Sequence, residues 1–473
     1  MGTEDEFGMI GTEEDVTQDL TRAVGGEHVS SRPSDVMFYA RDCWARRHLM
    51  PDDPPRHPVW VVWPGAASEV ARVLQVAGRH ELAVVPYGGG SNLVGGAGFG
   101  DDRPVLVVDT KRMSRVLELD ETSLIVQAQA GITGGDLDEY LRVRGLFVAH
   151  MPTSLSQSTL GGWLATRSAG AFTSRYGRID RVCMGITAAL PDGSVVRTRV
   201  APRRATGPDL MHLFLGSEGA LGIITAAHLK VVRVSKVRVW LAGGFKELSQ
   251  AVAAMADIMS SGTRPVVASI ADPVVALRHS GQPSFMLVCS FEGDGELPVV
   301  QRDEARLLVL AHGGAYLDPA AASGFWTARR NDVFGDIIAR AESRVIGEVD
   351  IGADWRHLAM VADDARGRLE SMGCGVTMEL GFFGLEGGAL LCKWQLPEIS
   401  DPEDVGLRQD EALAIVLDAA RRGGGAVAHH RGVGRQRSAA VRAQLGNRFD
   451  LFADVKRQLD PKGLMNPWLT EGA

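Results

Sequence analysis

A glycine-rich run placed directly after an apolar run constrains this chain more than any other stretch. Residues 86–96 read PYGGGSNLVGG and follow LAVVP (82–86), which has the composition of a buried strand. Glycine has no Cβ and tolerates a positive φ, so such a loop lets backbone N–H groups come close to a polyanion. At this point the loop can be interpreted either as a diphosphate-binding site or as a tight surface turn.

Three further stretches combine small residues with hydroxyl groups. They read TSLSQSTLGGWLATRSAG (153–170), SRYGRIDRVCMGITAALPDG (174–193) and GSEGALGIIT (216–225). Backbone of this kind can press against an extended phosphate-bearing ligand while its hydroxyls satisfy the ligand oxygens. Neither GxGxxG at the start of a helix nor GxxxxGK[ST] occurs, so the two common phosphate motifs are excluded. Four such loops in this order predict one ligand site rather than four unrelated turns.

The periodicity of apolar residues divides the chain into two unlike parts. VWVVWP (59–64) and ASEVARVLQVAGRH (67–80) predict a strand and an amphipathic helix, and similar alternation continues to residue 235 as a mixed α/β domain. Beyond it, strands such as FMLVCSFEG and GALLCKWQL are separated by predicted helices over 247–260, 300–312 and 357–371. This alternation of predicted strands and helices is typical of an α+β domain with an antiparallel sheet.

Composition excludes several classes of protein. The 473 residues carry a formal net charge of −8, which argues against general nucleic-acid binding. No apolar run approaches the roughly 18 residues of a spanning helix, and the acidic amino terminus lacks the features of a secretory signal, so a cytoplasmic location is expected. Five cysteines without a CxxC pair predict core thiols rather than a disulfide framework.

The order of the four loops resembles the FAD-binding domain of the vanillyl alcohol oxidase and p-cresol methylhydroxylase family of FAD-linked oxidases. The resemblance covers 58–235, and LDPKGLMNP (459–467) is similar to that family's carboxy-terminal signature. It implies an α+β fold with a two-part FAD-binding domain and an α+β substrate or cap domain. The expected division is an N-terminal helical or extended segment (1–57), the FAD-binding domain (58–235), the cap domain (236–425) and a segment that returns to the active site (426–473).

The same resemblance implies FAD contacts from three loops. The residues expected to bind FAD are Pro86, Tyr87, Gly88, Gly89, Gly90, Ser91 and Asn92 around the diphosphate, then Thr153, Ser154, Leu155, Ser156, Gln157, Ser158, Thr159, Gly162, Trp163, Leu164 and Ala165, and finally Gly216, Ser217, Glu218, Gly219, Ala220, Leu221 and Gly222. Some family members tether the flavin to a histidine. No histidine stands in or beside PYGGGSNLVGG, so non-covalent FAD is expected.

Within the family, LGGWLATRSAG followed by YGRIDRV resembles the alkylglycerone-phosphate synthases. GGGAVAHHRGVGRQR (423–437) is similar to their histidine triplet before GVG, but Arg431 stands at the third position. An arginine stays protonated, so it can donate hydrogen bonds or hold an anion but cannot accept a proton. GFFGLEGGALLCKW (381–394) also lacks the synthase tyrosine, and FWTARRNDVFGDII (325–338) lacks the synthase Pro-Tyr-Leu-Arg-Asp run.

The hydroxy-acid dehydrogenase branch of the family, which includes glycolate oxidases and D-lactate dehydrogenases, has a HxGDGNxH strand and a Glu-His pair that bind a divalent metal. This chain has GFFGLEGGAL and His430–Arg431 at the corresponding places, and no metal is expected. WTARRN (326–331) is similar to that branch, so Arg329 or Arg330 is a candidate anchor for a substrate carboxylate. A solvated arginine pair on a helix is the alternative.

Three functions follow from these residues. The favoured one is a flavin-dependent oxidoreductase that moves a hydride from a hydroxy acid or alcohol to flavin N5, with His429 or His430 as the base and Arg431 or Arg329 holding an anionic group. The others are a net non-redox transferase of the alkylglycerone-phosphate synthase type and a flavin-binding protein without catalysis. We expect a small anionic substrate. The sequence leaves the electron acceptor and the oligomeric state open, although it is compatible with a homodimer.

Overall fold

The computed structural model describes residues 11–40, 42–44, 59–97, 103–201, 205–331, 346–397 and 402–467. It begins with α1 (Glu13–Val24), the one-turn helix η1 (Gly26–His28), β1 (Val29–Ser30) and α2 (Pro33–Tyr39). The Thr12 hydroxyl accepts a hydrogen bond from the Asp15 N–H, and the Asp15 carboxylate accepts one from the Thr12 N–H. This capping box explains why α1 begins where it does.

The first sheet has the order β1-β2-β4-β3 and carries the glycine-rich loop. Its strands β2 (Val59–Val62), β3 (Ala83–Tyr87) and β4 (Val105–Asp109) are parallel, and α3 (Ala67–His80) connects β2 to β3. These strands are almost continuously apolar because both faces of a parallel sheet are buried. The glycine-rich loop therefore leaves the carboxyl end of a rigid, buried strand.

The second sheet completes the first part of the molecule. Its order is β5-β6-β10-β8-β9, and β7 pairs with β10. The strands are β5 (Val116–Asp120), β6 (Ile125–Gln129), β7 (Leu146–Val148), β8 (Cys183–Ala189), β9 (Val195–Arg197) and β10 (Ile223–Arg233). The helices between them are α4 (Gly134–Arg142), α5 (Leu160–Thr166), α6 (Thr173–Tyr176), α7 (Ile179–Val182) and α8 (Met211–Phe214). The residues PDG (191–193) lie in the connection between the antiparallel strands β8 and β9.

The second part, called the cap below, is built on one antiparallel sheet with the order β14-β11-β13-β12-β16-β17-β15. Its strands are β11 (Val237–Phe245), β12 (Val267–Ala271), β13 (Phe285–Gly293), β14 (Ala315–Leu317), β15 (Ile346–Asp354), β16 (Gly375–Gly381) and β17 (Gly387–Gln395). Its helices are α9 (Leu248–Ser260), α10 (Pro273–Ser280), α11 (Leu297–Ala311), α12 (Pro319–Asn331), α14 (Leu358–Ser371) and α15 (Pro402–Arg422). The antiparallel sheet and the three predicted cap helices are confirmed, as is the α+β fold.

Two apolar cores hold the cap together on opposite faces of its sheet. Helices α9, α11, α14 and α15 bury the larger one, which includes Phe245 and Phe383. Helices α10 and α12 cover part of the other face, around Met286 of β13 and Phe325 of α12. The strands β15, β16 and β17 are left to present the rest of that face to the first part of the molecule.

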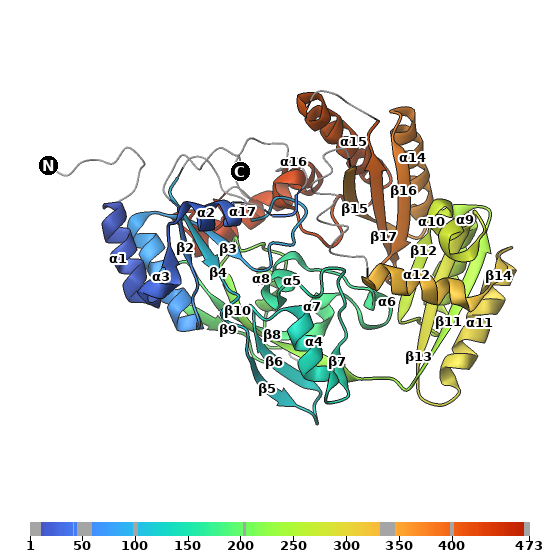
Figure 1. Cartoon of the computed structure of the whole chain (residues 1–473), viewed down its shortest axis with the longest axis horizontal. Coiled ribbons are helices and arrows are strands. Elements are labelled where there is room, and N and C mark those ends of the chain that lie inside the picture. Colours follow the sequence, from blue (N-terminus) through green and yellow to red (C-terminus); the bar gives the residue numbers. More distant parts are fainter. Residues whose placement is uncertain are drawn as a thin grey trace.

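The last helices, α16 (Gly434–Leu445) and α17 (Asn447–Leu459), are drawn in red (Figure 1), and the segment after them returns to the first part. The Val84 N–H donates to the Leu464 carbonyl at 2.7 Å, and the Asn466 N–H donates to the Val84 carbonyl at 2.8 Å. The buried Lys456 ammonium donates to the Ala220 carbonyl at 3.0 Å. The carboxy-terminal segment is therefore bound to the strand that carries the glycine-rich loop.

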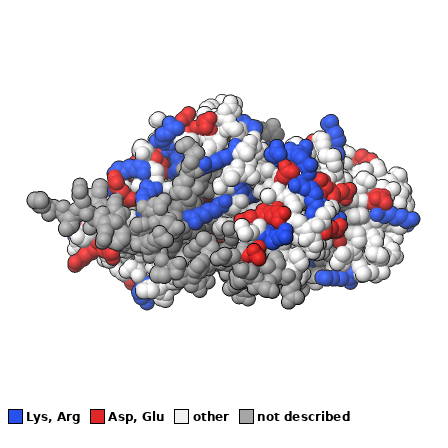
Figure 2. Space-filling view, turned by 90° about the horizontal axis from the view of Figure 1, so that it is seen from above, with Lys and Arg blue, Asp and Glu red and all other residues white. Residues whose placement is uncertain are grey.

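No helix in the described part of the chain combines the length and the hydropathy that crossing a bilayer requires. On the face seen in Figure 2, basic and acidic side chains are interspersed over the visible elements. This mixture is typical of an ordinary solvated surface rather than a surface of one sign.

Candidate functional site

A cavity lies where the loops of the first part meet strands β16 and β17 of the cap. We call it the cofactor cavity. Twenty of the residues that the sequence singles out line it, namely Pro86, Tyr87, Gly88, Gly89, Gly90, Ser91, Asn92, Thr153, Ser154, Ser158, Thr159, Gly162, Trp163, Ala165, Ser217, Glu218, Gly219, Gly222, His430 and Arg431. Three of the four predicted loops, which are far apart in the sequence, thus meet at one site, whereas no residue of the predicted loop 174–193 lines it.

Glycine is required in these loops because their backbones lie so close together. A Cβ on Gly89 would stand 2.0 Å from the Gln157 carbonyl oxygen, and one on Gly219 would stand 2.6 Å from the Pro86 ring. Gly90 and Gly219 also adopt positive φ angles of 63° and 77°, which side chains rarely allow. The result is a cradle of bare backbone that fits an extended diphosphate-bearing ligand such as FAD.

Polar contacts within the protein connect this cradle to the surrounding elements. The Lys111 ammonium donates to the Gly88 carbonyl at 2.9 Å and to the buried Asp109 carboxylate at 2.6 Å. At the next loop, the Thr159 hydroxyl caps α5 by accepting from the Gly162 N–H at 3.3 Å.

Seven residues expected to bind FAD do not line the cavity, and this corrects the prediction. Leu164, Ala220 and Leu221 are buried in the apolar cores behind it. The others are Leu155, Ser156, Gln157 and Gly216. The error arises because a loop or a short helix turns only some of its residues toward a ligand, whereas the resemblance marked continuous runs.

The cap closes the cavity with Phe382 and Leu391, which the sequence reading did not identify. Phe382 has a φ of 53°, a conformation that is rare for aromatic residues. Its ring centroid lies 4.4 Å from that of His430. The only sequence signal for this residue is the glycine-flanked pair in GFFG, which gives no indication of a positive φ.

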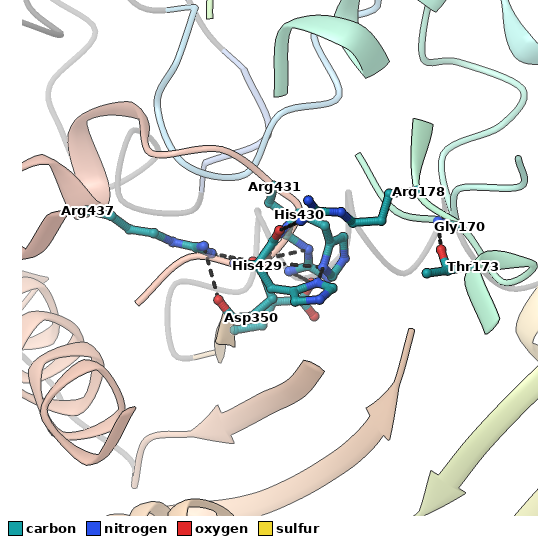
Figure 3. Close-up of polar contacts among 9 residues, drawn as sticks. Gly170, Thr173, Arg178, Asp350, His429, His430, Arg431 and Arg437 are labelled. Carbon is teal, nitrogen blue, oxygen red and sulfur yellow. Dashed lines mark hydrogen bonds and ion pairs between the residues drawn. The ribbon is translucent and has the colours of Figure 1, made fainter. Parts of the chain in front are cut away.

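A buried carboxylate on the cap sheet holds the two histidines (Figure 3). Asp350 is fully buried on β15, and its Oδ2 accepts the N–H groups of His429 at 3.1 Å and His430 at 2.8 Å. The His430 Nδ1 lies 3.2 Å from the same oxygen, and the buried Arg437 guanidinium donates to Asp350 Oδ1 at 2.5 Å. The site therefore sets His430 in place through both its backbone and its ring.

Burial is the main influence on the protonation of both histidines. It lowers the pKa of His429 to about 4 and lowers that of His430 well below its ordinary value, although Asp350 opposes the shift. The pKa of Asp350 is lowered, because Arg437 and the neighbouring cations outweigh its burial. At neutral pH the site thus combines neutral imidazoles with an ionised carboxylate. The His430 Nδ1 shares a hydrogen bond with the His429 Nδ1 at 3.0 Å, and in the tautomer in which the His430 Nδ1 is the donor, the His430 Nε2 is the proton-accepting atom.

The two candidate anion-binding arginines are already paired with carboxylates on the cap sheet. Arg431 forms an ion pair with Glu348, and Arg329 forms one with Glu379. Arg329 does not line the cavity but lies over the Phe382 ring at 5.6 Å, and burial lowers its pKa to about 10. The expectation of an open arginine that holds a substrate carboxylate therefore needs revision. Arg330, the neighbour in the same motif, has a side chain outside the described residues.

Asp350, His429 and His430 also form a trio whose candidate ligand atoms lie within 4.8 Å of one another. Both oxygens of Asp350 are already engaged, one by Arg437 and the other by two backbone N–H groups. A carboxylate used in this way is a poor ligand for a cation. The expectation of no metal at this site stays a prediction.

A second buried carboxylate, Glu218, holds the same turn from the opposite side. It accepts the N–H groups of Val433 at 2.6 Å and Gly434 at 3.0 Å, and burial raises its pKa to about 7. Gly432 has a φ of 86° and leaves no room for a Cβ, which would lie 2.9 Å from that carboxyl group. The turn that carries His430 is therefore clamped between Asp350 of the cap and Glu218 of the first part.

Replacing Glu218 with glutamine is expected to destabilise the fold by about 1–3 kcal/mol. A glutamine side chain has one acceptor oxygen, so it could accept only one of the two N–H groups of Val433 and Gly434. Its NH₂ group would then face the other N–H, which would have no acceptor. Urea unfolding at about pH 8, where Glu218 is ionised, measures the change, and amide hydrogen exchange over 431–436 should accelerate. The exposed Glu304 of α11, changed to glutamine, is the control. Unchanged unfolding and exchange would show that Glu218 does not clamp the turn.

Comparisons with known proteins agree with this geometry. Residues 58–199 match the model of an FAD binding domain, and residues 234–469 match that of the C-terminal domain of FAD linked oxidases. An alkyldihydroxyacetonephosphate synthase of Trypanosoma brucei brucei is 34% identical over 235 residues, which are 49% of this chain and 38% of that protein. The glycolate oxidase subunit GlcD of Bacillus subtilis is 26% identical over 96% of both chains.

The fold is also found in a solved structure of p-cresol methylhydroxylase with substrate bound. It has a TM-score of 0.80 and 16% sequence identity, and the match covers 97% of this chain and 96% of the other. At that identity the likeness concerns the fold alone. It places the predicted two-part arrangement among known flavoprotein architectures.

Proposed function

The chain belongs to the FAD-linked oxidases and binds FAD, and on that premise we propose that it oxidises a hydroxy acid or an alcohol. The observation that carries the proposal is the buried, neutral His430 on the wall of the cofactor cavity, oriented by the ionised Asp350. FAD would supply the hydride acceptor. A base that takes the hydroxyl proton must come from the protein, and His430 is suited to that role.

The residues around His430 would orient its ring, exclude water and stabilise the substrate oxygen. Asp350 holds the Nδ1 side of the ring, so that Nε2 can accept a proton from a substrate hydroxyl. Phe382 and Leu391 cover the cavity with apolar surface, which keeps water from the reacting carbon. Arg431 keeps N–H donors beyond its pair with Glu348, and these can steady the oxygen that loses its proton.

A net non-redox transferase is the second candidate, supported by the similarity to alkyldihydroxyacetonephosphate synthases over 49% of the chain. It would use the same FAD cavity with different substrates. Arg431 at the third position of the histidine motif weighs against it, because a guanidinium cannot take part in proton transfer. A flavin-binding protein without catalysis is the third candidate, and the experiment below must distinguish it from the two enzymes.

Anaerobic mixing with a panel of D- and L-hydroxy acids, sugars and alcohols tests the proposal. An oxidised substrate must bleach the flavin absorbance in the absence of oxygen. A transferase would convert its substrate while the flavin stays oxidised, and a simple flavin-binding protein would do neither. Bleaching by dithionite but by no member of the panel would overturn the assignment.

The FAD is expected to be bound without a covalent tether, since no histidine lies in or beside the glycine-rich loop. The purified protein should be yellow, and acid precipitation should release intact FAD into the supernatant. Chromatography of the supernatant and absorbance of the redissolved pellet measure the two fractions. Flavin that stays with the pellet would contradict the expectation.

A further inference from the structure

A second cavity of about 730 Å³ adjoins the cofactor cavity on the side of His429. Phe382 lines both cavities, with His430 in the first and His429 in the second. The Nδ1 atoms of the two histidines are 3.0 Å apart. The two cavities are therefore separated by a single layer of rings.

Basic side chains converge on this second cavity from both parts of the molecule. Arg175, Arg178, Arg181 and Lys230 come from the first part and Arg264 from the cap. The carboxylates that line it are Asp180, Asp354 and Glu386, so cations outnumber them by two. A cavity of this composition favours an anionic occupant.

The partners of these groups leave much of the positive charge available. Asp180 lies 3.4 Å from Arg178, whose guanidinium also donates to the His429 carbonyl, so this arginine reaches the wall between the cavities (Figure 3). Asp354 is occupied by the His357 ring at 2.8 Å. Arg181 and Arg264 are exposed and make no ion pair with any residue in the described ranges.

The rest of the lining suits a polar molecule rather than an alkyl chain. Seven of the lining residues are glycines, and they present bare backbone instead of apolar side chains: Gly177, Gly352, Gly384, Gly387, Gly388, Gly424 and Gly425. At the cofactor cavity, by contrast, Arg431 is neutralised by Glu348, and Arg329, which lies over the Phe382 ring outside the cavity, is neutralised by Glu379. A carboxylate bound beside Arg431 would face Glu348 as well as the arginine.

We propose that the second cavity is an anion subsite, which takes a carboxylate or phosphate group that is several bonds away from the carbinol oxidised beside His430. This inference rests on the proposed function and narrows its substrate class. The substrate would be an alcohol with a distal anionic group rather than a 2-hydroxy acid, in which the two groups are adjacent. Arg181 and Arg264 would bind the anion, while Arg178 would lie along the path to the histidines.

Titration calorimetry of the FAD-loaded protein with inorganic pyrophosphate tests the subsite without a substrate. Bound FAD occupies the diphosphate cradle, so the probe cannot bind there. Changing Arg181 and Arg264 together to alanine should weaken binding about tenfold or more, since hydrogen bonds to charged groups are lost. The matched control changes Arg408 and Arg457, which are also exposed and distant in sequence, to alanine. No binding, or equal binding by both double variants, would overturn the subsite.

Anaerobic flavin bleaching with matched alcohols tests the substrate class. The panel contains 2-hydroxy acids, alcohols with a distal carboxylate, alcohols with a distal phosphate and neutral alcohols. Alcohols with a distal anionic group should bleach the flavin fastest, and the Arg181/Arg264 double variant should lose this rate advantage. The rates with the distal carboxylates and the distal phosphates show which of the two anions the subsite prefers. If 2-hydroxy acids bleach fastest and the double variant leaves their rate unchanged, the subsite fails but the proposed function stands. If no alcohol bleaches the flavin, the proposed function fails and calorimetry still decides the subsite.

Discussion

Replacing Gly89 with valine is expected to abolish FAD binding. The new Cβ would lie 2.0 Å from the Gln157 carbonyl oxygen and 2.9 Å from its carbon, far inside van der Waals contact. Neither loop can yield easily, because Lys111 holds the Gly88 carbonyl and the Gln157 N–H donates to the Ser154 carbonyl at 2.9 Å. The side chain would therefore force apart the two loops that form the FAD cradle.

The ratio of flavin to protein after gel filtration in excess FAD measures this effect, and circular dichroism checks the fold. Gly367→Val is the control, because Gly367 is an exposed helical position with no atom within 4 Å of the added Cβ. The control should keep its full FAD content. A Gly89→Val protein that also retains FAD would mean that the cradle is assigned to the wrong loops.

Replacing His430 with alanine is expected to leave FAD bound and the protein folded, yet to slow flavin reduction by roughly 10²–10⁴, the usual loss for a missing general base. The physical reason is that the other groups at this wall cannot replace it: Arg431 stays protonated, and Asp350 is buried and bonded to Arg437. Rapid anaerobic mixing with an active substrate measures the rate. His312→Ala is the matched control, since His312 also contacts an aspartate, Asp257, at 2.7 Å but lies elsewhere in the cap.

The pH dependence of the parent protein follows from the same pKa. Burial lowers the pKa of His430, and the neutral imidazole is the active form. Reduction should therefore be insensitive to pH between about 6 and 9 and should fall only under more acidic conditions, where His430 becomes protonated. Equal rates for the parent and the His430→Ala variant over that range would make His430 structural.

The cofactor cavity could be predicted largely from the sequence because its signals are local. A run of glycines and hydroxyl residues after a buried strand indicates close backbone packing, and three of the four predicted loops meet at the cavity. The prediction was less accurate at single residues. The glycine run predicts positive φ angles without saying where: the structure has one at Gly90, whereas at Gly89 the obstacle to a side chain is the neighbouring loop.

The substrate side of the site could not be predicted in the same way because its contacts cross between distant segments. Asp350 lies in the strand segment GEVDIGAD, which also carries Glu348 and Asp354, so the sequence does not distinguish Asp350 as the fully buried carboxylate. Its partner Arg437 is one of several arginines in the tail, and nothing local distinguishes it. Likewise, the pairing of Arg329 with Glu379 depends on how α12 lies across β16, so the arginine appears free when the sequence is read alone.

The central claim is that the protein removes a hydride from a carbinol carbon beside His430. Anaerobic mixing of the FAD-loaded protein with a secondary alcohol substrate deuterated at that carbon tests it most directly. The account predicts that the flavin bleaches more slowly than with the unlabelled substrate, that one substrate molecule is consumed for each flavin, and that the product carbonyl compound has lost its deuterium. Conversion of the substrate with its deuterium retained, while the flavin stays oxidised, would contradict the account.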